Sequence, residues 1–225
     1  MIEQTRKAPM AYDGFYNRYI KRLLDILISG GVLALIWPVL LAVSVAIALE
    51  TGFPVLYRAD RGGYLGKKFR ICKFRTMVKN ADKIGGGTTA LHDSRITKVG
   101  NFLRKTKLDE LPQFAQVFLG KMSIIGPRPE LLYYTGQYAG DEKDILKVRP
   151  GITDFSSIEF VNLDEIVGGE NADEMYEKKV LPRKNQLRVQ YAHSVSFSTD
   201  VRIFFRTVCA VLAKAVGFVF RKEHQ

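Results

Sequence analysis

Residues 21–49 read KRLLDILISGGVLALIWPVLLAVSVAIAL. From Ile26 to Leu49 this stretch carries no charge, and a run of that length can reach across the hydrocarbon core of a bilayer as a helix. A cleavable signal peptide is a poorer interpretation, because the run is too long and no small-residue cleavage site follows it. A buried core helix is the alternative that length and composition leave open.

Two features bear on how this helix sits in a membrane. Pro38 lies near the middle of the run, where it removes a backbone donor and crowds the preceding turn, so we expect a bend there. Basic residues flank both ends of the run: Arg18, Lys21, Arg22, Arg58 and Arg61. Positive flanks favour the cytoplasmic side, so these charges favour a helix that enters and leaves on one face, whereas length alone favours crossing.

The remainder of the chain predicts a mixed fold. Residues 55–57 and 69–72 have the composition of two strands, joined by a glycine-rich connection that suits a hairpin. A helix is predicted to begin near Thr106, where Thr106-Lys107-Leu108-Asp109 fits an N-terminal cap, or a little later because of Pro112, and to end at Gly120. Further helices are predicted at 172–193, as a charged surface helix interrupted by Pro182, and at 199–220, as an amphipathic helix. Residues 80–95 are polar and glycine-rich, which is typical of a loop.

We therefore expect an α+β fold, mostly helical, with a small β-hairpin and an N-terminal membrane helix bent at Pro38. The expected organisation is an arm over residues 1–18, the membrane helix over 19–52 and one domain over 53–225.

The charge balance indicates an anionic partner. The chain has 34 basic and 23 acidic residues, a net charge of +11, which suits nucleic acid, a membrane surface or phosphorylated ligands. No recognisable nucleic-acid-binding module accompanies this charge, so we expect no nucleic acid partner. Cys72 and Cys209 form no metal or redox motif, and His92, His193 and His224 lack metal-ligand spacing.

Candidate chemistry begins with Asp109 and Glu110. Adjacent acids on a helix do not face each other, so a solvated helix start is the plain alternative. The preceding residues are basic, and a helix start adds positive potential, so both effects would keep a carboxylate ionised. An ionised carboxylate suits a nucleophile or a Mg²⁺ ligand.

Three basic side chains are candidates for binding phosphate. Arg128 lies between two prolines, and a guanidinium held by stiff backbone can grip a phosphate with two parallel hydrogen bonds. Lys73 and Arg75 are two apart on a predicted strand and would point to one face. The alternatives are an ordinary turn for Arg128 and a solvated edge strand for the other two.

Four motifs in order resemble one protein family. They are Lys73-Phe74-Arg75-Thr76-Met77, Leu103–Gln113 with the string Leu-Asp-Glu-Leu-Pro, Gly126-Pro127-Arg128-Pro129, and Arg149-Pro150-Gly151-Ile152-Thr153. Their order and spacing closely resemble those of the bacterial sugar transferases, the monotopic phosphoglycosyl transferases that begin surface-glycan assembly. The resemblance runs from about Tyr19 to Phe205, and the length resembles the minimal, catalytic-unit members.

This resemblance implies an activity and site residues. Members transfer a sugar-1-phosphate from a UDP-sugar to polyprenyl phosphate, with Mg²⁺, at the cytoplasmic face of the bacterial inner membrane. It implies that Asp109 is the nucleophile, that Glu110 supports catalysis and the Mg²⁺ site with Asp109, and that Arg128 contacts substrate phosphate. The further substrate-binding residues expected on this basis are Lys73, Arg75, Arg104, Arg149 and Asp200. The monotopic form also favours re-entry of residues 19–52 over crossing.

The chain departs from the family pattern at two positions. Trp37 precedes Pro38 where the family often has Ser, and Asp154 follows Thr153 where the family often has Gly. A membrane-tethered nucleic-acid-binding protein and a non-catalytic membrane adaptor are the rival functions. Release of UMP from a UDP-sugar distinguishes the transferase from both.

Overall fold

The computed structural model describes residues 10–84, 89, 93–168 and 171–222. As predicted, the fold is α+β and mostly helical, with a small antiparallel hairpin. The strands are β1 (Leu56–Gly62), β2 (Lys68–Phe74), β3 (Ser123–Ile125) and β4 (Gly151–Thr153). The α-helices are α1 (Lys21–Thr51), α2 (Ala81–Ile84), α3 (Lys98–Thr106), α4 (Gln113–Phe118), α5 (Leu132–Thr135), α6 (Phe155–Glu159), α7 (Leu163–Val167), α8 (Ala172–Met175), α9 (Leu181–Ser194) and α10 (Phe197–Lys222). Short 3-10 or π-helical segments are η1 (Ala11–Asp13), η2 (Tyr16–Ile20), η3 (Tyr64–Gly66), η4 (Leu108–Glu110), η5 (Gly140–Lys147) and η6 (Tyr176–Val180).

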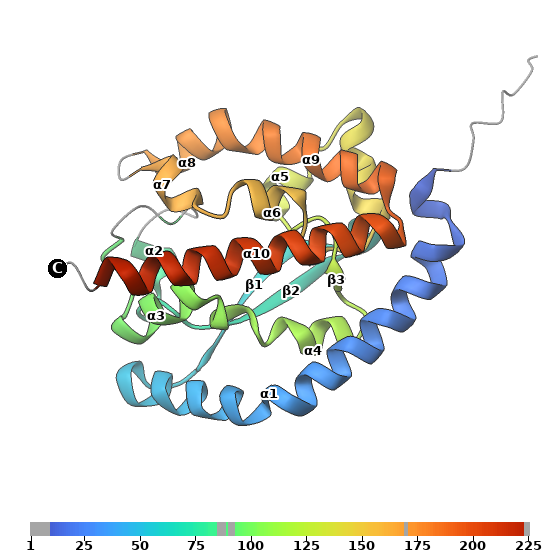
Figure 1. The fold of residues 1–225 in the computed structure, drawn as a ribbon. Helices are drawn as coiled ribbons and strands as arrows, with labels where there is room; N and C mark the ends of the chain where they lie inside the picture. The colour runs from blue at the N-terminus through green and yellow to red at the C-terminus, as the bar shows by residue number, and fades with distance from the viewer. Residues whose placement is uncertain (1–9, 85–88, 90–92, 169–170, 223–225) are drawn as a thin grey trace, which may run out of the picture.

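Helix α1 runs along the side and lower edge of the molecule, while α10 crosses its middle and α9 lies above (Figure 1). Among the described residues, Tyr16–Thr51 is the one helical stretch long and apolar enough to cross a membrane, and only 11% of its most apolar window is buried. The helix is continuous through Pro38; the bend at that residue stays a prediction.

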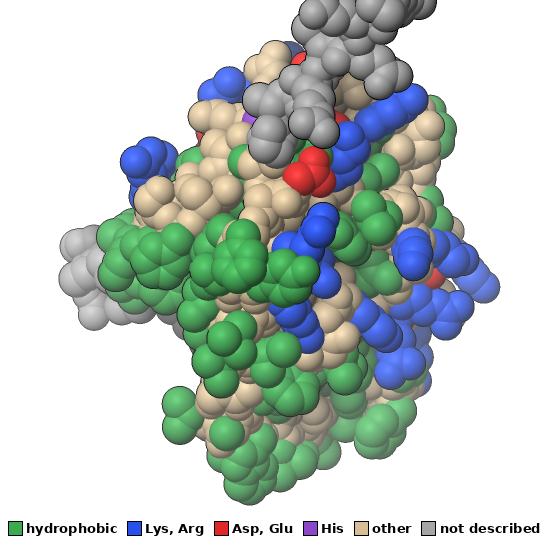
Figure 2. Space-filling model, turned by 90° about the vertical axis from the view of Figure 1, so that its right-hand side faces the viewer, with side chains coloured by type: hydrophobic (Ala, Val, Ile, Leu, Met, Phe, Trp, Pro, Cys, Tyr) green, Lys and Arg blue, Asp and Glu red, His purple; other side chains and the backbone are tan. Residues whose placement is uncertain are grey.

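The exposed face of α1 is apolar. Figure 2 shows hydrophobic side chains covering the lower part of the molecule, the level at which α1 lies in Figure 1, with Lys and Arg side chains gathered beside them. The most exposed large side chains of α1 are Leu23, Leu27, Leu35, Trp37, Leu41 and Leu49. An uncovered apolar surface of this length is typical of a segment that contacts lipid rather than water.

The first half of α1 is held on the domain by polar contacts. Arg22 donates to the carbonyl oxygens of Val117 (2.6 Å) and Phe118 (2.8 Å) at the end of α4. The carboxylate of Asp25 accepts from the backbone N–H of Ile124 in β3 at 3.0 Å. The Val117 carbonyl also accepts from the N–H of Gly120 at 2.9 Å, so Arg22 is a second donor to the carbonyl groups at this helix end.

The second half of α1 is held by apolar packing. Val43 and Ile47 lie in one buried cluster with Phe74 of β2 and Leu103 of α3. Both halves of α1 therefore rest on the same domain, while the middle of the helix is largely exposed.

The hairpin predicted from the sequence is present. Strands β1 and β2 pair in register from Leu56 opposite Phe74 to Gly62 opposite Lys68. On the outer edge of β2, the side-chain amide of Gln116 accepts from the N–H of Cys72 (2.8 Å) and donates to the carbonyl of Arg70 (2.6 Å). Gln116 thus closes part of an open strand edge and fixes α4 beside β2.

A second, parallel pair of strands was not predicted. Strands β3 and β4 pair Ser123 with Gly151 and Ile125 with Thr153. Gly126 and Gly151 let the two chains approach, because a Cβ on Gly151 would lie 2.2 Å from the Gly126 nitrogen. This pairing brings the two proline-glycine loops of the sequence side by side.

Two helix predictions were wrong in detail. Thr106 ends α3 rather than starting a helix, because Lys107 takes a left-handed conformation (φ 61°). The regular helix α4 begins after Pro112, which is the later start that the proline indicated. The stretch 172–193 is helical, with a π-helical turn before Pro182, but it is not simply a surface helix. Its α9 portion buries a set of polar and charged side chains: Lys184, Asn185 and Arg188.

Helix α10 confirms the predicted last helix and extends it to Phe197–Lys222. Phe204, Phe205 and Val208 are exposed on it, whereas Ile203 is fully buried. Part of the predicted loop at 80–95 forms α2, while residues 85–88 and 90–92, like residues 1–9 of the predicted arm, lie outside the described residues.

Candidate active site

Glu110 is the centre of the candidate site. Its carboxylate accepts two hydrogen bonds from the guanidinium of Arg128, one of them at 2.9 Å, and a third from the ammonium of Lys73 at 3.1 Å. These side chains come from η4, from the loop after β3 and from β2. Three motifs far apart in sequence therefore meet at one carboxylate.

The charges in this cluster are strongly coupled. The cations Arg128 and Lys73 hold the pKa of Glu110 well below its ordinary value against the opposing effect of burial. Burial and the neighbouring Arg128 lower the pKa of Lys73. Glu110 is therefore ionised across the physiological pH range, as the sequence predicted for this pair.

Asp109 behaves differently from its neighbour. Its side chain is buried, and burial, followed by the charge of Glu110, raises its pKa above the ordinary value. Lys73, Lys107 and Arg104 act in the opposite direction. Basic surroundings therefore lower the pKa of Glu110 as the sequence predicted, whereas at Asp109 burial and the charge of Glu110 outweigh the basic residues and raise the pKa.

Asp109 has the geometry of a group kept free for a ligand. No described residue donates a hydrogen bond to its carboxylate, whereas both oxygens of Glu110 accept hydrogen bonds, two at Oε1 and one at Oε2. The one-turn helix η4 follows the left-handed residue Lys107, which sets Asp109 and Glu110 on a tight turn rather than on a long helix. A desolvated, unengaged carboxylate beside a cation cluster is a suitable nucleophile.

The backbone around Arg128 is held by the paired loops. Its guanidinium also donates to the carbonyl of Ile152 at 2.8 Å, and its own N–H lies 3.4 Å from the carboxylate of Asp154. Asp154 is fully buried and caps α6 by accepting from the N–H of Ser157 at 2.7 Å. The family departure at Asp154 thus contributes a buried carboxylate beneath the loop that carries Arg128.

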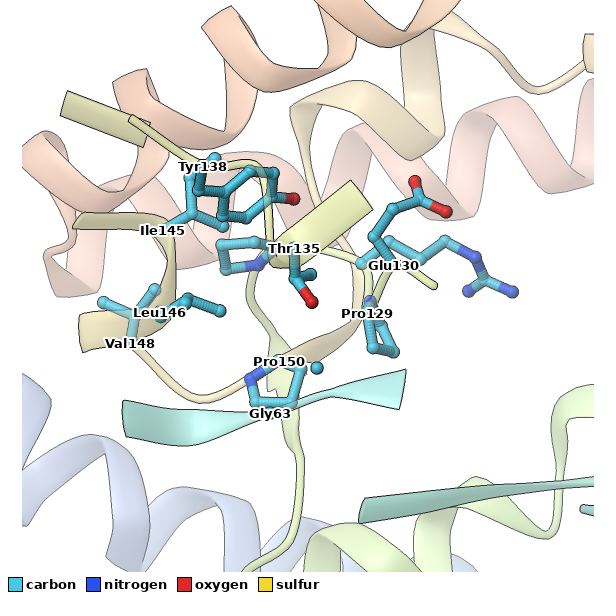
Figure 3. Close-up of a pocket in the computed structure, with 12 residues that line it drawn as sticks. Gly63, Pro129, Glu130, Thr135, Tyr138, Ile145, Leu146, Val148 and Pro150 are labelled. Atoms are coloured by element: carbon cyan, nitrogen blue, oxygen red, sulfur yellow. The ribbon is translucent and has the colours of Figure 1, made fainter. Parts of the chain in front are cut away.

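A small pocket lies on the other side of this loop (Figure 3). Ile145, Leu146 and Val148 line it, together with Pro129 and Pro150. The carboxylate of Glu130 points away from these apolar side chains in Figure 3. The pocket is mostly apolar. It therefore fits packing of the loop Gly126–Pro129, here called the proline loop, against η5 better than recognition of a charged group.

The two acids were also predicted to hold Mg²⁺. Within the described residues, no group of three or more His, Cys, Asp or Glu side chains could hold a metal ion. Magnesium commonly uses one or two protein carboxylates together with substrate phosphates. The pair Asp109 and Glu110 fits that arrangement, because the Asp109 oxygens are not engaged.

Not all predicted substrate-binding residues meet at this site. Arg104 is in the last turn of α3, and its positive charge acts to lower the pKa of Asp109. Arg75 instead donates to the hydroxyl of Thr51 (2.6 Å) and the carbonyl of Gly52 (2.5 Å), where it closes the end of α1. Arg149 stacks over the ring of Tyr64 at 5.0 Å, in the connection between β1 and β2.

Asp200 lies in a separate, buried network. It pairs with Lys21 at the start of α1 and accepts hydrogen bonds from Tyr16 and Tyr191, both at 2.7 Å. These contacts join α10, α9 and the membrane helix. The structure thus places Asp200 as an anchor for α1, apart from the carboxylate pair at Asp109.

Comparisons with known proteins identify the family of the chain. The family model described as bacterial sugar transferase matches residues 16–214. A UDP-glucose:undecaprenyl-phosphate glucose-1-phosphate transferase of Escherichia coli (strain K12) is 38% identical over 85% of this chain and 40% of its own length. A protein of the same name from Caulobacter vibrioides is 32% identical over 85% of this chain and 69% of its own. An uncharacterized sugar transferase of Bacillus subtilis (strain 168) is 34% identical over 86% of this chain and 87% of its own length.

The match includes the apolar helix α1, the hairpin and all four motifs. The chain spans about two fifths of the length of the Escherichia coli relative. On the family model and these relatives, this chain belongs to the bacterial sugar transferase family.

Proposed function

We propose that this protein transfers a sugar-1-phosphate from a UDP-sugar to polyprenyl phosphate, such as undecaprenyl phosphate, releasing UMP. The observation that carries the proposal is the unengaged carboxylate of Asp109 beside the ion-paired cluster of Glu110, Arg128 and Lys73. The printed names of the relatives, which act on UDP-glucose or UDP-N-acetylgalactosamine with undecaprenyl phosphate, support it.

The first step is attack by Asp109. A carboxylate oxygen of Asp109 forms a bond to the phosphorus that bears the sugar, and the bond from that phosphorus to the bridging oxygen breaks. UMP leaves with the electron pair, and a covalent aspartyl-phosphosugar remains. Such an intermediate divides one difficult displacement into two easier ones.

In the second step, an oxygen of polyprenyl phosphate attacks the same phosphorus. The bond to Asp109 breaks, the carboxylate is regenerated, and polyprenyl-diphosphate-sugar is the product. The exposed apolar face of α1 would keep the domain at the bilayer surface, where this lipid is found.

Positive charge is needed throughout, because both substrates carry phosphate and repel each other. Arg128 is held by two prolines and by Ile152, so it can exchange part of its bonding to Glu110 for phosphate oxygens without a large movement. Bound Mg²⁺, held by Asp109 and Glu110, would supply further positive charge at the phosphates. Glu110 keeps Arg128 and Lys73 oriented.

This activity would serve as the first membrane step of surface polysaccharide or glycoconjugate assembly. We place the domain of residues 53–225 at the cytoplasmic face of the bacterial inner membrane, because nucleotide-sugars are cytoplasmic metabolites. Residues 19–52 are proposed to re-enter that face, in agreement with the contacts that both halves of α1 make to one domain.

The test is a panel of UDP-sugars assayed with undecaprenyl phosphate and Mg²⁺, with UMP release as the readout. The proposal expects release with at least one sugar and dependence on the lipid for turnover. Binding to liposomes without UMP release from any UDP-sugar would instead favour a non-catalytic adaptor.

A further inference from the structure

Lys184 on α9 is a buried cation that has no role in the proposed reaction. Its side chain is 8% exposed, and its ammonium forms no hydrogen bond or ion pair with any described residue. It lies 4.8 Å from the ring centroid of Tyr176 and 5.8 Å from that of Phe160. Ring faces attract a cation only weakly compared with an anion, so the ammonium still lacks an acceptor.

The charges around Lys184 are already paired with one another. The carboxylate of Glu130 accepts from Arg188 at 2.9 Å and from the hydroxyl of Tyr176 at 2.5 Å, and the backbone N–H of Leu131 donates to its other oxygen at 3.3 Å. The side chain of Arg188 is 1% exposed, and its Nη1 donates to the side-chain oxygen of Asn185 at 3.1 Å, while its Nε has no partner among the described residues. Lys184 is therefore the surplus positive charge of this cluster.

Burial, followed by the neighbouring Arg188, lowers the pKa of Lys184 to about 8. The side chain is still mostly protonated at neutral pH. Holding a charge in a buried place without an acceptor costs stability, and such a cost is common where a group serves a ligand rather than the fold.

The position of Lys184 relative to the candidate active site suggests which ligand. Its charge interacts with those of Arg128 and Asp154, the two residues at the proline loop. Glu130 follows Arg128 by two residues and accepts from Arg188 and from Tyr176, whose ring faces Lys184, so the chain after Arg128 runs into the Lys184 cluster. An anion bound at Arg128 is thus within electrostatic reach of Lys184 from a different element of the fold.

We infer that the ammonium of Lys184 binds a phosphate oxygen of a substrate, as a second cationic contact beside Arg128. The inference rests on the proposed function and deepens it. The shared chemistry is a phosphate group, and its two possible sources are the diphosphate of the UDP-sugar and the phosphate of the polyprenyl acceptor.

The experiment uses the full chain in lipid nanodiscs and compares Lys184→Met and Lys184→Arg with wild type. UDP binding is measured by calorimetry, and the KM for undecaprenyl phosphate is measured by UMP release. Loss of one charged hydrogen bond predicts that Lys184→Met weakens one of these two by about tenfold or more. A weaker UDP affinity would identify the UDP-sugar as the source of the phosphate, and a raised KM for undecaprenyl phosphate would identify the lipid. Lys184→Arg should recover part of the loss.

Thermal unfolding separates this role from a structural one. Methionine replaces a buried, unpaired ammonium by an apolar group of similar length, so Lys184→Met should unfold at the same temperature as wild type or higher. A lower unfolding temperature would identify Lys184 as a structural residue and overturn the inference.

Lys179→Met is the matched control, because Lys179 is exposed on the preceding turn and its loss changes net charge equally. The control should bind UDP and turn over like wild type. If the control and Lys184→Met are both active with unchanged UDP affinity and unchanged KM, the inference fails and the proposed function stands. Wild type that releases no UMP would instead remove the proposed function itself.

Discussion

Arg128 meets Glu110 through two parallel hydrogen bonds, Nη1 to Oε2 at 2.9 Å and Nη2 to Oε1. The same carboxylate also holds Lys73. Glu110 is therefore the group that gathers the two cations beside Asp109, and its neighbour is left free to react. The division of roles within one acidic pair comes from which carboxylate is engaged and which is not.

The first prediction concerns Arg128. Arg128→Lys keeps the charge but loses the two-pronged geometry, so kcat/KM for UMP release should fall by about tenfold or more, from about 1.5–3 kcal/mol for a charged hydrogen bond. Arg183→Lys is the control, since Arg183 forms an exposed pair with Glu159. Unchanged kinetics in Arg128→Lys would reduce Arg128 to a turn residue.

The second prediction concerns pH. Because burial and then the charge of Glu110 raise the pKa of Asp109, and because only the ionised form attacks, kcat/KM should rise with pH through that pKa. Glu110→Gln removes the negative charge next to Asp109 and releases Lys73 and Arg128 from their ion pairs. Both changes lower the pKa of Asp109. The acid limb of the kcat/KM profile should therefore move to lower pH, even though the plateau falls.

The matched control for the pH profile is Glu174→Gln, which alters an exposed pair with Lys178 and should leave the limb in place. An acid limb in Glu110→Gln that stays where it is in wild type, or moves to higher pH, would contradict the assignment of that limb to Asp109.

Lys73 was predicted from the sequence as a site residue, whereas Lys184 was not. The motifs that carry Lys73, Asp109 and Arg128 were identified because their order and spacing resemble those of a known family, and the structure brings all three together. Lys184 is one of several basic residues in a helical stretch, and it was taken as part of a charged surface. Its burial could have been suspected, because it falls four residues after buried Val180 and three before buried Leu187.

The helix boundaries and Asp200 show what short-range patterns miss. The capping pattern at Thr106 was locally sound, but Lys107 adopts a left-handed conformation, and Gly100 lies against Thr76, where a Cβ would approach within 2.0 Å. The partner of Asp200 is Lys21, 179 residues away. Such distant pairings depend on the packed fold, and no local pattern specifies them.

The third prediction concerns that pair. Asp200 and Lys21 are both buried, so Asp200→Asn leaves an uncompensated charge and should destabilise the protein by about 3–5 kcal/mol. The folded fraction should keep its KM for the UDP-sugar, because Asp200 anchors α1. Thermal unfolding in detergent, with exposed Asp141→Asn as control, measures the first effect. An unaltered unfolding temperature with a raised KM would show that Asp200 binds substrate.

The fourth prediction concerns membrane topology. Because both halves of α1 rest on one domain, residues 19–52 should enter and leave on the cytoplasmic face. A single cysteine at residue 5 (Thr5→Cys), in a background with Cys72→Ser and Cys209→Ser, should resist a membrane-impermeant thiol reagent in intact cells and react once the cells are opened. Labelling from outside would mean that α1 crosses the membrane.

The most direct test of the central claim is intact-mass analysis of the protein after incubation with UDP-sugar and Mg²⁺ in the absence of polyprenyl phosphate. The account predicts an added mass equal to one phosphosugar, mapped to Asp109 and discharged when undecaprenyl phosphate is supplied. Asp109→Asn should fold, bind membranes, gain no mass and release no UMP. Near-normal turnover by Asp109→Asn would contradict the covalent route through this residue.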